Sequence, residues 1–305
     1  MRQMRGADVA GGALPPGAPA GPAPTPGVFW KRQRGRVALG LMLGLLAGPA
    51  MAAPARVVSV NLCTDQLAML LAAPGQLVSV SHLAGDPRSS VMAAEAAGYA
   101  ANRGGAEEVF LMRPDLVLAG TYTARASVGL LRRLGVPVVE LPPANRLSDV
   151  PVHLRAVGAA LGQEARAEAL VAEFAAGLEA LRATGGRAAT AALYYPNGYT
   201  TGAGTLADDI LAVTGFANVG ATAGLTGGGN LPLERLVMAA PELVVTSAPY
   251  PGASRSEEIL RHPALGALRD RAAARVVSDG DWICGIPQIL RAVAGMADAR
   301  KALAP

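Results

Sequence analysis

The sequence predicts an α/β fold with two lobes joined by one long α-helix and a ligand cleft between the lobes. One motif occurs twice, at residues 107–117 and 234–244, and reads Glu, six residues, Pro, an acidic residue, Leu and Val. Strand-like apolar runs also alternate with helical patterns on both sides of residues 149–184, which hold no strand-like run. The motif copies lie 127 residues apart, too far for a solenoid repeat and suited to two similar lobes.

Each motif copy reads as a short helix that leads into a buried strand. Apolar residues recur three and four positions apart, a Pro ends the helix, and the apolar runs 116–119 and 243–246 follow. We expect the acid that begins each helix, Glu107 or Glu234, to be exposed.

The first 52 residues read as a leader that is removed from the mature protein. A Pro/Gly/Ala-rich tract without periodicity fills most of residues 6–27. A basic stretch, an 11-residue apolar run and a small-residue cleavage site follow at 31–52 and match a secretory signal peptide. The apolar run is shorter than the roughly 20 residues of a membrane span, and no Cys directly follows the cleavage site. We therefore expect a soluble periplasmic protein without a lipid anchor, and Val28 is a candidate start of the chain.

The charge of the mature chain argues against some partners. Six of the 27 basic residues but only one of the 23 acidic residues precede the cleavage site, which leaves 21 basic and 22 acidic residues. The net charge is therefore near −1, and nothing in the composition points to nucleic acid or an anionic membrane. A hydrophobic content of 51% is ample for the cores of two lobes.

The two lobes are expected at residues 53–148 and 185–305. The first is predicted to have strands at 56–61, 77–80, 116–119 and 136–141 and helices at 65–71 and 124–134. The second is predicted to have strands at 189–195, 243–246 and 275–278, helices at 206–214 and 287–303, and a Gly-rich loop at 224–230. This alternation predicts Rossmann-like parallel sheets, which bind ligands at the carboxyl ends of their strands.

The linker is expected at residues 149–184. Its apolar residues keep a helical spacing, and residues 163–183 read as one helix of about 20 residues, about 30 Å long. Pro151 suits a helix start, and Gly162 is a point where the helix can be interrupted or bent.

The order and spacing of these segments resemble the helical-backbone (class III) periplasmic substrate-binding proteins of ABC importers for cobalamin, ferric siderophores and haem. The likeness is greatest to the cobalamin-binding members and covers almost all of the mature chain. Besides the linker, it is carried by residues 56–59, 105–109, 113–117, 134–138, 199–202, 233–236 and 278–282. The resemblance implies a binding protein that captures a metal chelate and delivers it to an ABC transporter permease. A corrinoid is the first choice of ligand, and a ferric siderophore or haem is the next.

The resemblance also assigns a role to the duplicated acids. In this family the first Glu of each repeat lies on the rim of its lobe and pairs with Arg on the permease, and by position these residues are Glu107 and Glu234. The alternative is an acid that only favours its own helix start, by roughly 0.3–1 kcal/mol. The duplication favours docking, because paired rim charges set the register and rate of association.

Polar and aromatic residues after the strands predict the ligand site. They are Asn61, Cys63, Thr64, His82 and Tyr122 from the first lobe and Tyr195, Asn197, Tyr199, Trp282 and Cys284 from the second. Aromatic side chains stack on conjugated ligands, and Trp282 is the only Trp of the mature chain. Where cobalamin-binding proteins carry an aromatic before the docking Glu, this chain has residues 101–104, so Arg103 is a candidate partner for an anionic ligand group.

The two cysteines leave three alternatives open. Cys63 and Cys284 pair readily in an oxidising compartment, and a disulfide across 221 residues would contribute at most about 5 kcal/mol. With His82 they could instead form a soft metal or corrinoid-cobalt site. The third alternative is two free, unrelated thiols. The other histidines, His153 and His262, read as surface residues.

Other functions have less support from the sequence. The triple Gly at 227–229 lacks the Lys of a phosphate loop, and no zinc-protease or nucleophile-elbow motif is present. A metal-cluster enzyme of the same fold and a carrier of free metal ions are the alternatives, although few His and Cys residues are available as ligands. We expect a monomer with no catalytic residue, no cofactor and no nucleic-acid partner.

Overall fold

The computed structural model describes residues 53–249, 254–277 and 280–303. The predicted leader and signal peptide lie outside this part of the chain. Among the described helices, none is both long and apolar enough to cross a membrane.

The first sheet has five parallel strands in the order β3-β2-β1-β4-β5. The strands are β1 (Val57–Ser59), β2 (Leu77–Ser81), β3 (Ala100–Asn102), β4 (Leu116–Gly120) and β5 (Val138–Leu141). The helices around it are α1 (Leu62–Leu71), α2 (Ala93–Ala96), α3 (Ala106–Leu111) and α4 (Arg125–Arg133), together with a 3₁₀ helix at His82–Gly85. The chain order reverses between β1 and β4, so their carboxyl ends form a switch point where doubly wound sheets bind ligands.

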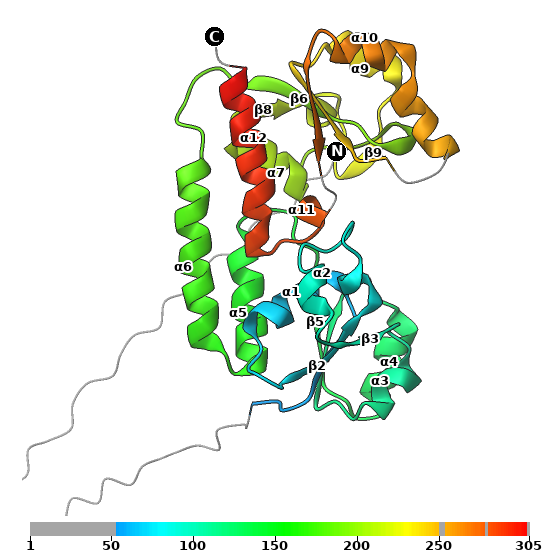
Figure 1. Ribbon diagram of the computed structural model, residues 1–305, viewed down its shortest axis with the longest axis vertical. Helices are drawn as coiled ribbons and strands as arrows, with labels where there is room; N and C mark the ends of the chain where they lie inside the picture. The colour runs from blue at the N-terminus through cyan, green and yellow to red at the C-terminus, as the bar shows by residue number, and fades with distance from the viewer. Residues whose placement is uncertain (1–52, 250–253, 278–279, 304–305) are drawn as a thin grey trace, which may run out of the picture. The chain divides into compact units, whose positions relative to one another are not determined.

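The second sheet has four parallel strands in the order β11-β10-β6-β8, and β7 and β9 form a separate antiparallel pair. The strands are β6 (Ala189–Leu193), β7 (Tyr199–Thr201), β8 (Phe216–Asn218), β9 (Gly228–Asn230), β10 (Leu243–Ser247) and β11 (Ala273–Val277). The helices are α7 (Leu206–Val213), α8 (Val219–Thr222), α9 (Leu233–Ala239), α10 (Pro263–Arg269), α11 (Gly280–Ile283) and α12 (Leu290–Ala302), with 3₁₀ helices at Pro196–Gly198, Arg255–Arg261 and Pro287–Ile289. The predicted α/β fold with parallel sheets in two lobes is confirmed (Figure 1).

The sequence did not predict four short strands. β3, β7, β8 and β9 have three residues each, and β9 lies in the stretch predicted as a Gly-rich loop. Such strands are too short to show a period in the sequence, and they form because a neighbouring strand supplies the hydrogen bonds.

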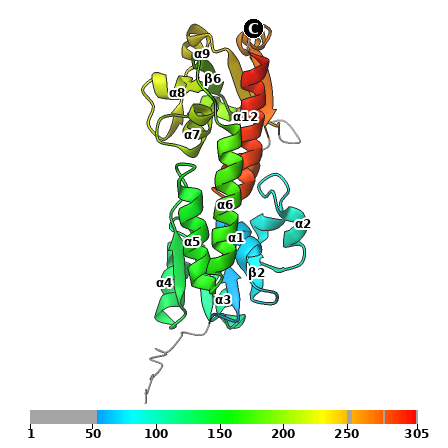
Figure 2. The ribbon, with the colours of Figure 1, turned by 90° about the vertical axis from the view of Figure 1, so that its left-hand side faces the viewer.

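The predicted linker contains two helices, α5 (Asp149–Leu161) and α6 (Glu164–Leu181), which run side by side (Figure 2). Gly162 ends α5 in the left-handed conformation, with φ of 68°. The two helices approach so closely that a Cβ on Gly158 would lie 2.5 Å from Cβ of Ala167. The prediction of one helix at 163–183 is correct for α6 within two residues, and the remainder of the linker is a separate helix.

α6 is the long connecting helix. It has 18 residues and is therefore about 27 Å long. Whereas α5 packs against α1, α6 packs against α12. One apolar core contains Leu118 of the first sheet, Leu154 and Phe174 of these helices, and Leu193 of the second sheet. The predicted limits of the lobes, 53–148 and 185–305, stay predictions.

The two motif copies have the same local structure. α3 leads into β4 and α9 leads into β10, and the residue before each motif Pro, Arg113 or Ala240, has a positive φ of 51° or 42°. This left-handed residue ends the helix and turns the chain into a fully buried strand.

The acidic residue of each motif holds the start of a neighbouring strand. Asp115 accepts hydrogen bonds from the backbone N–H groups of Ala55 and Arg56, at 2.9 and 2.8 Å, just before β1. Glu242 accepts one from the N–H of Thr190 in β6, at 2.9 Å, and forms an ion pair with Arg187. The motif therefore specifies a helix, a turn, and hydrogen bonds that connect its strand to the neighbouring strand.

Candidate ligand site

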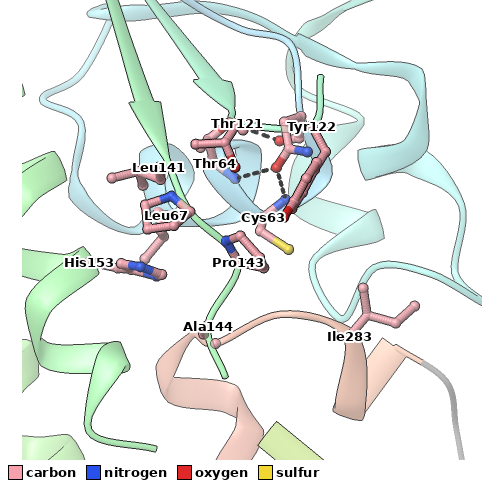
Figure 3. Close-up of a pocket in the computed structure, with 14 residues that line it drawn as sticks. Cys63, Thr64, Leu67, Thr121, Tyr122, Leu141, Pro143, Ala144, His153 and Ile283 are labelled. Atoms are coloured by element: carbon pink, nitrogen blue, oxygen red, sulfur yellow. Dashed lines mark hydrogen bonds between the residues drawn. The ribbon is translucent and has the colours of Figure 1, made fainter. Parts of the chain in front are cut away.

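A pocket lies at the switch point of the first sheet and has a volume of about 100 Å³ (Figure 3). Its lining comes from α1 and the residue before it, from the ends of β4 and β5 with the segments after them, from α5, and from the end of α11 with the segment after it. The lining residues are Asn61, Cys63, Thr64, Leu67, Gly120, Thr121, Tyr122, Leu141, Pro142, Pro143, Ala144, His153, Ile283 and Gly285. This volume is smaller than that of a typical ligand site, so the pocket can hold only part of a large ligand.

Asn61 shapes the pocket by capping α1. Its Oδ1 accepts hydrogen bonds from the N–H groups of Cys63 and Thr64, at 3.1 and 3.4 Å. Gly120 at the end of β4 lies close by, since a Cβ there would be 2.9 Å from Nδ2 of Asn61. Thr64 is buried, and its hydroxyl lies 2.8 Å from that of Ser59. Helix capping and a glycine therefore set the distance between the ends of β1 and β4.

Tyr122 is the aromatic residue that the pocket presents to solvent. Its side chain is 87% exposed. The loop that carries it is fixed on both sides, because Thr121 N–H donates to Leu141 O at 3.0 Å and Gly120 N–H donates to Thr123 Oγ1 at 2.9 Å. Tyr122 is thus an exposed ring on a well-anchored loop.

His153 corrects a prediction, because it is buried and lines the pocket from α5. His153 and Ile283 enter the pocket from opposite sides (Figure 3). Burial lowers the pKa of His153 and favours the neutral ring, although Asp149 partly opposes that shift. Its helical spacing from the buried Val150 and Val157 was a signal that could have placed it inside.

The structure joins Cys63 and Cys284 in a disulfide, with 5.2 Å between the two Cα atoms. Of the three alternatives, it is therefore the bridge that the structure contains, and these sulfur atoms are not thiolate ligands. The bond holds the 283–285 segment against the first lobe. Gly285 approaches Ala144 so closely that a Cβ would lie 2.2 Å from Cβ of Ala144.

The pocket brings together only part of the predicted site. Asn61, Cys63, Thr64 and Tyr122 line it, and Cys284 is bonded to Cys63. The residues that do not line it are His82, Arg103, Tyr195, Asn197, Tyr199 and Trp282. Their roles as ligand contacts stay predictions.

The remaining predicted contacts have various environments. His82 and Arg103 are exposed, and the backbone N–H of Arg103 donates to Glu108 Oε2 at 2.9 Å. Tyr195 and Trp282 are half-buried against the main core. The other two residues belong to the β7 region: Asn197, which is exposed with a φ of 57°, and Tyr199, which is 44% exposed.

Two polar features outside the pocket lining were not predicted. Arg88 lies in the loop after β2, and its Nη2 donates to Ala248 O, at the end of β10, at 3.1 Å. Asp65 of α1 is fully buried and accepts hydrogen bonds from the backbone N–H and the hydroxyl of Ser81. Burial raises the pKa of Asp65 to about 6, although its hydrogen bonds with Ser59 and Ser81 act against this shift.

The described residues contain no group of three His, Cys, Asp or Glu side chains placed to hold a metal ion. The pocket lining itself holds no Asp, Glu, Lys or Arg. Its polar groups are the amide, hydroxyl and imidazole groups of Asn61, Thr64, Thr121, Tyr122 and His153. The site can therefore offer hydrogen bonds and apolar contacts without a full charge.

Glu107 and Glu234 are both exposed. Neither carboxylate forms a hydrogen bond or an ion pair with another described residue. The neighbouring Glu108 is half-buried and holds the N–H of Arg103. Of the two adjacent acids, Glu107 is thus the one available to a partner.

Solved structures with the same fold come from several bacteria. The periplasmic heme-binding protein of Roseiflexus sp. RS-1 is 22% identical with a TM-score of 0.66, over 80% of this chain and 98% of that chain. The periplasmic vitamin B12-binding protein of Vibrio cholerae is 17% identical with a TM-score of 0.63, over 82% and 98%. The molybdate-binding protein of Haemophilus influenzae is 19% identical with a TM-score of 0.64, over 82% and 86%. At these identities the likeness concerns the fold.

A search of curated proteins found no match to this chain. The sequence model of one family, described as periplasmic binding protein, matches residues 57–279. This match covers both sheets and the helices between them. The chain therefore belongs to the periplasmic binding protein family.

Proposed function

We propose that this chain is the substrate-binding component of an ABC importer and works in the periplasm after removal of its signal peptide. It captures a metal chelate between the lobes 53–148 and 185–305 and delivers it to the inner-membrane permease. The main support for a metal chelate as ligand is the pocket of the first sheet, whose lining is uncharged and includes the exposed ring of Tyr122.

This lining suits a bulky conjugated ligand better than a small ion. A free cation needs several carboxylate, imidazole or thiolate ligands, and a small oxyanion is usually held by cationic side chains or several N–H groups. A conjugated chelate instead stacks on aromatic rings and needs only a few hydrogen bonds for orientation. Asn61, Thr64 and His153 can supply such hydrogen bonds at the base of the site.

A corrinoid is the first choice of ligand, and a ferric siderophore or haem is the next. The structural relatives whose names mention heme and vitamin B12 support the chelate class. We propose that His82, Arg103, Tyr195, Asn197, Tyr199 and Trp282 complete the site around the part of the ligand that the pocket cannot hold.

The test is the ligand content of the protein purified from its own periplasm. Its absorption spectrum distinguishes a corrinoid, a ferric chelate and haem. Protein stripped of ligand is then titrated with cyanocobalamin, a ferric hydroxamate, hemin, molybdate and Zn²⁺. Saturable binding of a chelate supports the proposal, whereas binding of molybdate or Zn²⁺ alone would overturn it.

A further inference from the structure

A second concave site lies away from the switch point of the first sheet. It is a groove of about 640 Å³ where the start of α5, the second half of α6 and the end of α7 come together (Figure 2). Among the described residues, none lines both this groove and the pocket that holds Tyr122. The groove has the size of a typical small-molecule site, about 300–1,000 Å³, whereas the pocket at the switch point has about 100 Å³.

Most of the groove surface is apolar, since eight of its 13 lining residues are apolar. Phe174 of α6 and Leu147 before α5 form its base and are only 2% and 3% exposed. The half-buried side chains of Val171, Leu178 and Val213 surround this base. Such a surface favours an apolar ligand, because binding removes these side chains from water.

Hydrogen bonds fix the segment that forms one edge of the groove. Asp209 of α7 accepts a hydrogen bond from the backbone N–H of Leu147 at 2.7 Å. Asp149 in the first turn of α5 accepts one from the backbone N–H of Arg146 at 3.0 Å. The segment is therefore attached to both helices, and a wall that is fixed in advance lowers the entropic cost of binding.

The charges of the groove leave one cation without a partner. Asp209 is engaged with the N–H of Leu147, and Glu179 forms an ion pair with Arg182 at 3.1 Å. The guanidinium of Arg146, in contrast, forms no hydrogen bond or ion pair with another described residue. The groove thus offers one free positive charge beside an apolar surface, which suits a ligand with one anionic group.

We propose that this groove is a second binding site and that it takes a free fatty acid. The apolar chain lies against Phe174 and the side chains around it, and the carboxylate pairs with Arg146. A cationic ligand is disfavoured because both acids of the groove already have partners. A flat membrane surface is disfavoured because it would leave the base of a concave site without contacts. The site is separate from the proposed chelate site and from the contact with the permease.

The experiment titrates the purified protein with laurate, dodecan-1-ol and dodecyltrimethylammonium by calorimetry, each below its critical micelle concentration. The three probes have the same apolar chain and differ in the charge of the head group. We expect laurate to bind at one saturable site. Dodecan-1-ol should bind about 10-fold more weakly, because it loses a hydrogen bond between charged groups, and the cationic probe should bind more weakly still.

Variants with matched controls locate the bound laurate. A175F places a large side chain in the groove and should abolish binding, whereas A172F changes an exposed alanine of α6 outside the lining and should bind as the parent does. R146Q should weaken laurate binding about 10-fold and leave the affinity for dodecan-1-ol unchanged. Its control is R133Q, at an exposed arginine of α4. Y122A should bind laurate normally, because Tyr122 belongs to the other pocket.

The results that would overturn the proposal are distinct. They are a parent protein that does not bind laurate, a folded A175F that binds it as the parent does, or a Y122A that loses it. Equal affinities for the three head groups would overturn the assignment of a carboxylate ligand. Binding to phosphatidylglycerol vesicles without binding of monomeric laurate would make a membrane the occupant. Circular dichroism checks the fold of A175F, and if that variant does not fold, R146Q and the head-group series still decide. The chelate titration is a separate measurement, so failure of either proposal leaves the other standing.

Discussion

At the residue scale, Asp65 makes the stability of this protein depend on pH. The folded-state pKa of about 6 exceeds the ordinary value of 3.8, so the folded protein binds this proton more tightly than the unfolded chain. The contribution of Asp65 to the free energy of unfolding should therefore decrease as the pH rises from about 4 to about 6, by up to about 3 kcal/mol, and then stay level.

The variant D65N should remove this dependence. An amide keeps the acceptor for Ser81 N–H and can donate to the Ser81 hydroxyl, so we expect a flatter curve and a higher stability at pH 7 than in the parent protein. Urea unfolding between pH 4 and 8 measures this, with D298N at an exposed acid as the control. A pH slope in D65N equal to that of the parent would contradict the assignment.

Also at the residue scale, Tyr122 should affect ligand binding without affecting stability. A ring that is 87% exposed contributes little to folding, whereas stacking on a ligand is worth about 0.5–1.5 kcal/mol. We expect Y122A to weaken ligand binding about 3-fold to 10-fold and Y122F to bind as the parent does. Ligand titration and thermal unfolding of the three proteins check both statements, and loss of affinity in Y122F would point to the hydroxyl instead.

At the scale of elements, the acids inside the two motifs, Asp115 and Glu242, should both stabilise the fold. D115A removes two backbone hydrogen bonds and E242A removes one, together with an ion pair, so each should lower the free energy of unfolding by about 1–3 kcal/mol. The control E179A breaks an exposed ion pair with Arg182 and should change it by less than about 1 kcal/mol. If the parent protein and the three variants have equal free energies of unfolding in urea, the hydrogen bonds of Asp115 and Glu242 do not stabilise the fold.

The first acids of the motifs should affect transport instead. Reversal of both charges in E107K with E234K should abolish uptake in cells and leave ligand affinity intact, because both side chains are exposed. The measurement pairs uptake of labelled ligand with titration of the purified variant. The control is E108K, because Glu108 already accepts a hydrogen bond from the backbone N–H of Arg103. If the double charge reversal leaves uptake unchanged, Glu107 and Glu234 do not dock the protein on the permease.

The sequence predicted most elements because their patterns are local. The long strands and helices have runs of apolar residues with a clear period, and the Pro of each motif marks its strand. In the sequence, Gly162 was the only sign of the turn between α5 and α6. The apolar residues keep the same helical spacing through both helices, and the turn depends on how the two helices pack against each other.

The site was predicted less completely than the fold. Asn61, Thr64 and Tyr122 directly follow strands of one sheet, so strand ends were enough to find them. His153 and Ile283 reach the pocket through packing between segments far apart in sequence, which a local pattern does not contain. Trp282 and Tyr199 are residue types that suit a ligand, but they do not line the pocket. A local sequence pattern does not reveal this either.

At the scale of the whole molecule, the disulfide links the two lobes and should stabilise both. Its removal in C63S with C284S should lower the free energy of unfolding by about 2–5 kcal/mol. Thiol titration of the native protein should find no reactive thiol before reduction and two afterwards. Two titratable thiols before reduction, or a double variant as stable as the parent, would contradict a structural bridge.

The same bond has a consequence for the biogenesis of the protein. Cys63 lies 11 residues after the predicted cleavage site, and Cys284 follows it 221 residues later. In a chain translocated from its N-terminus, Cys63 waits for its partner until both sheets and the helices between them have crossed the membrane. The bridge therefore cannot close on a chain that stalls before residue 284. Its presence in an exported molecule therefore shows that the chain has crossed the membrane at least as far as residue 284.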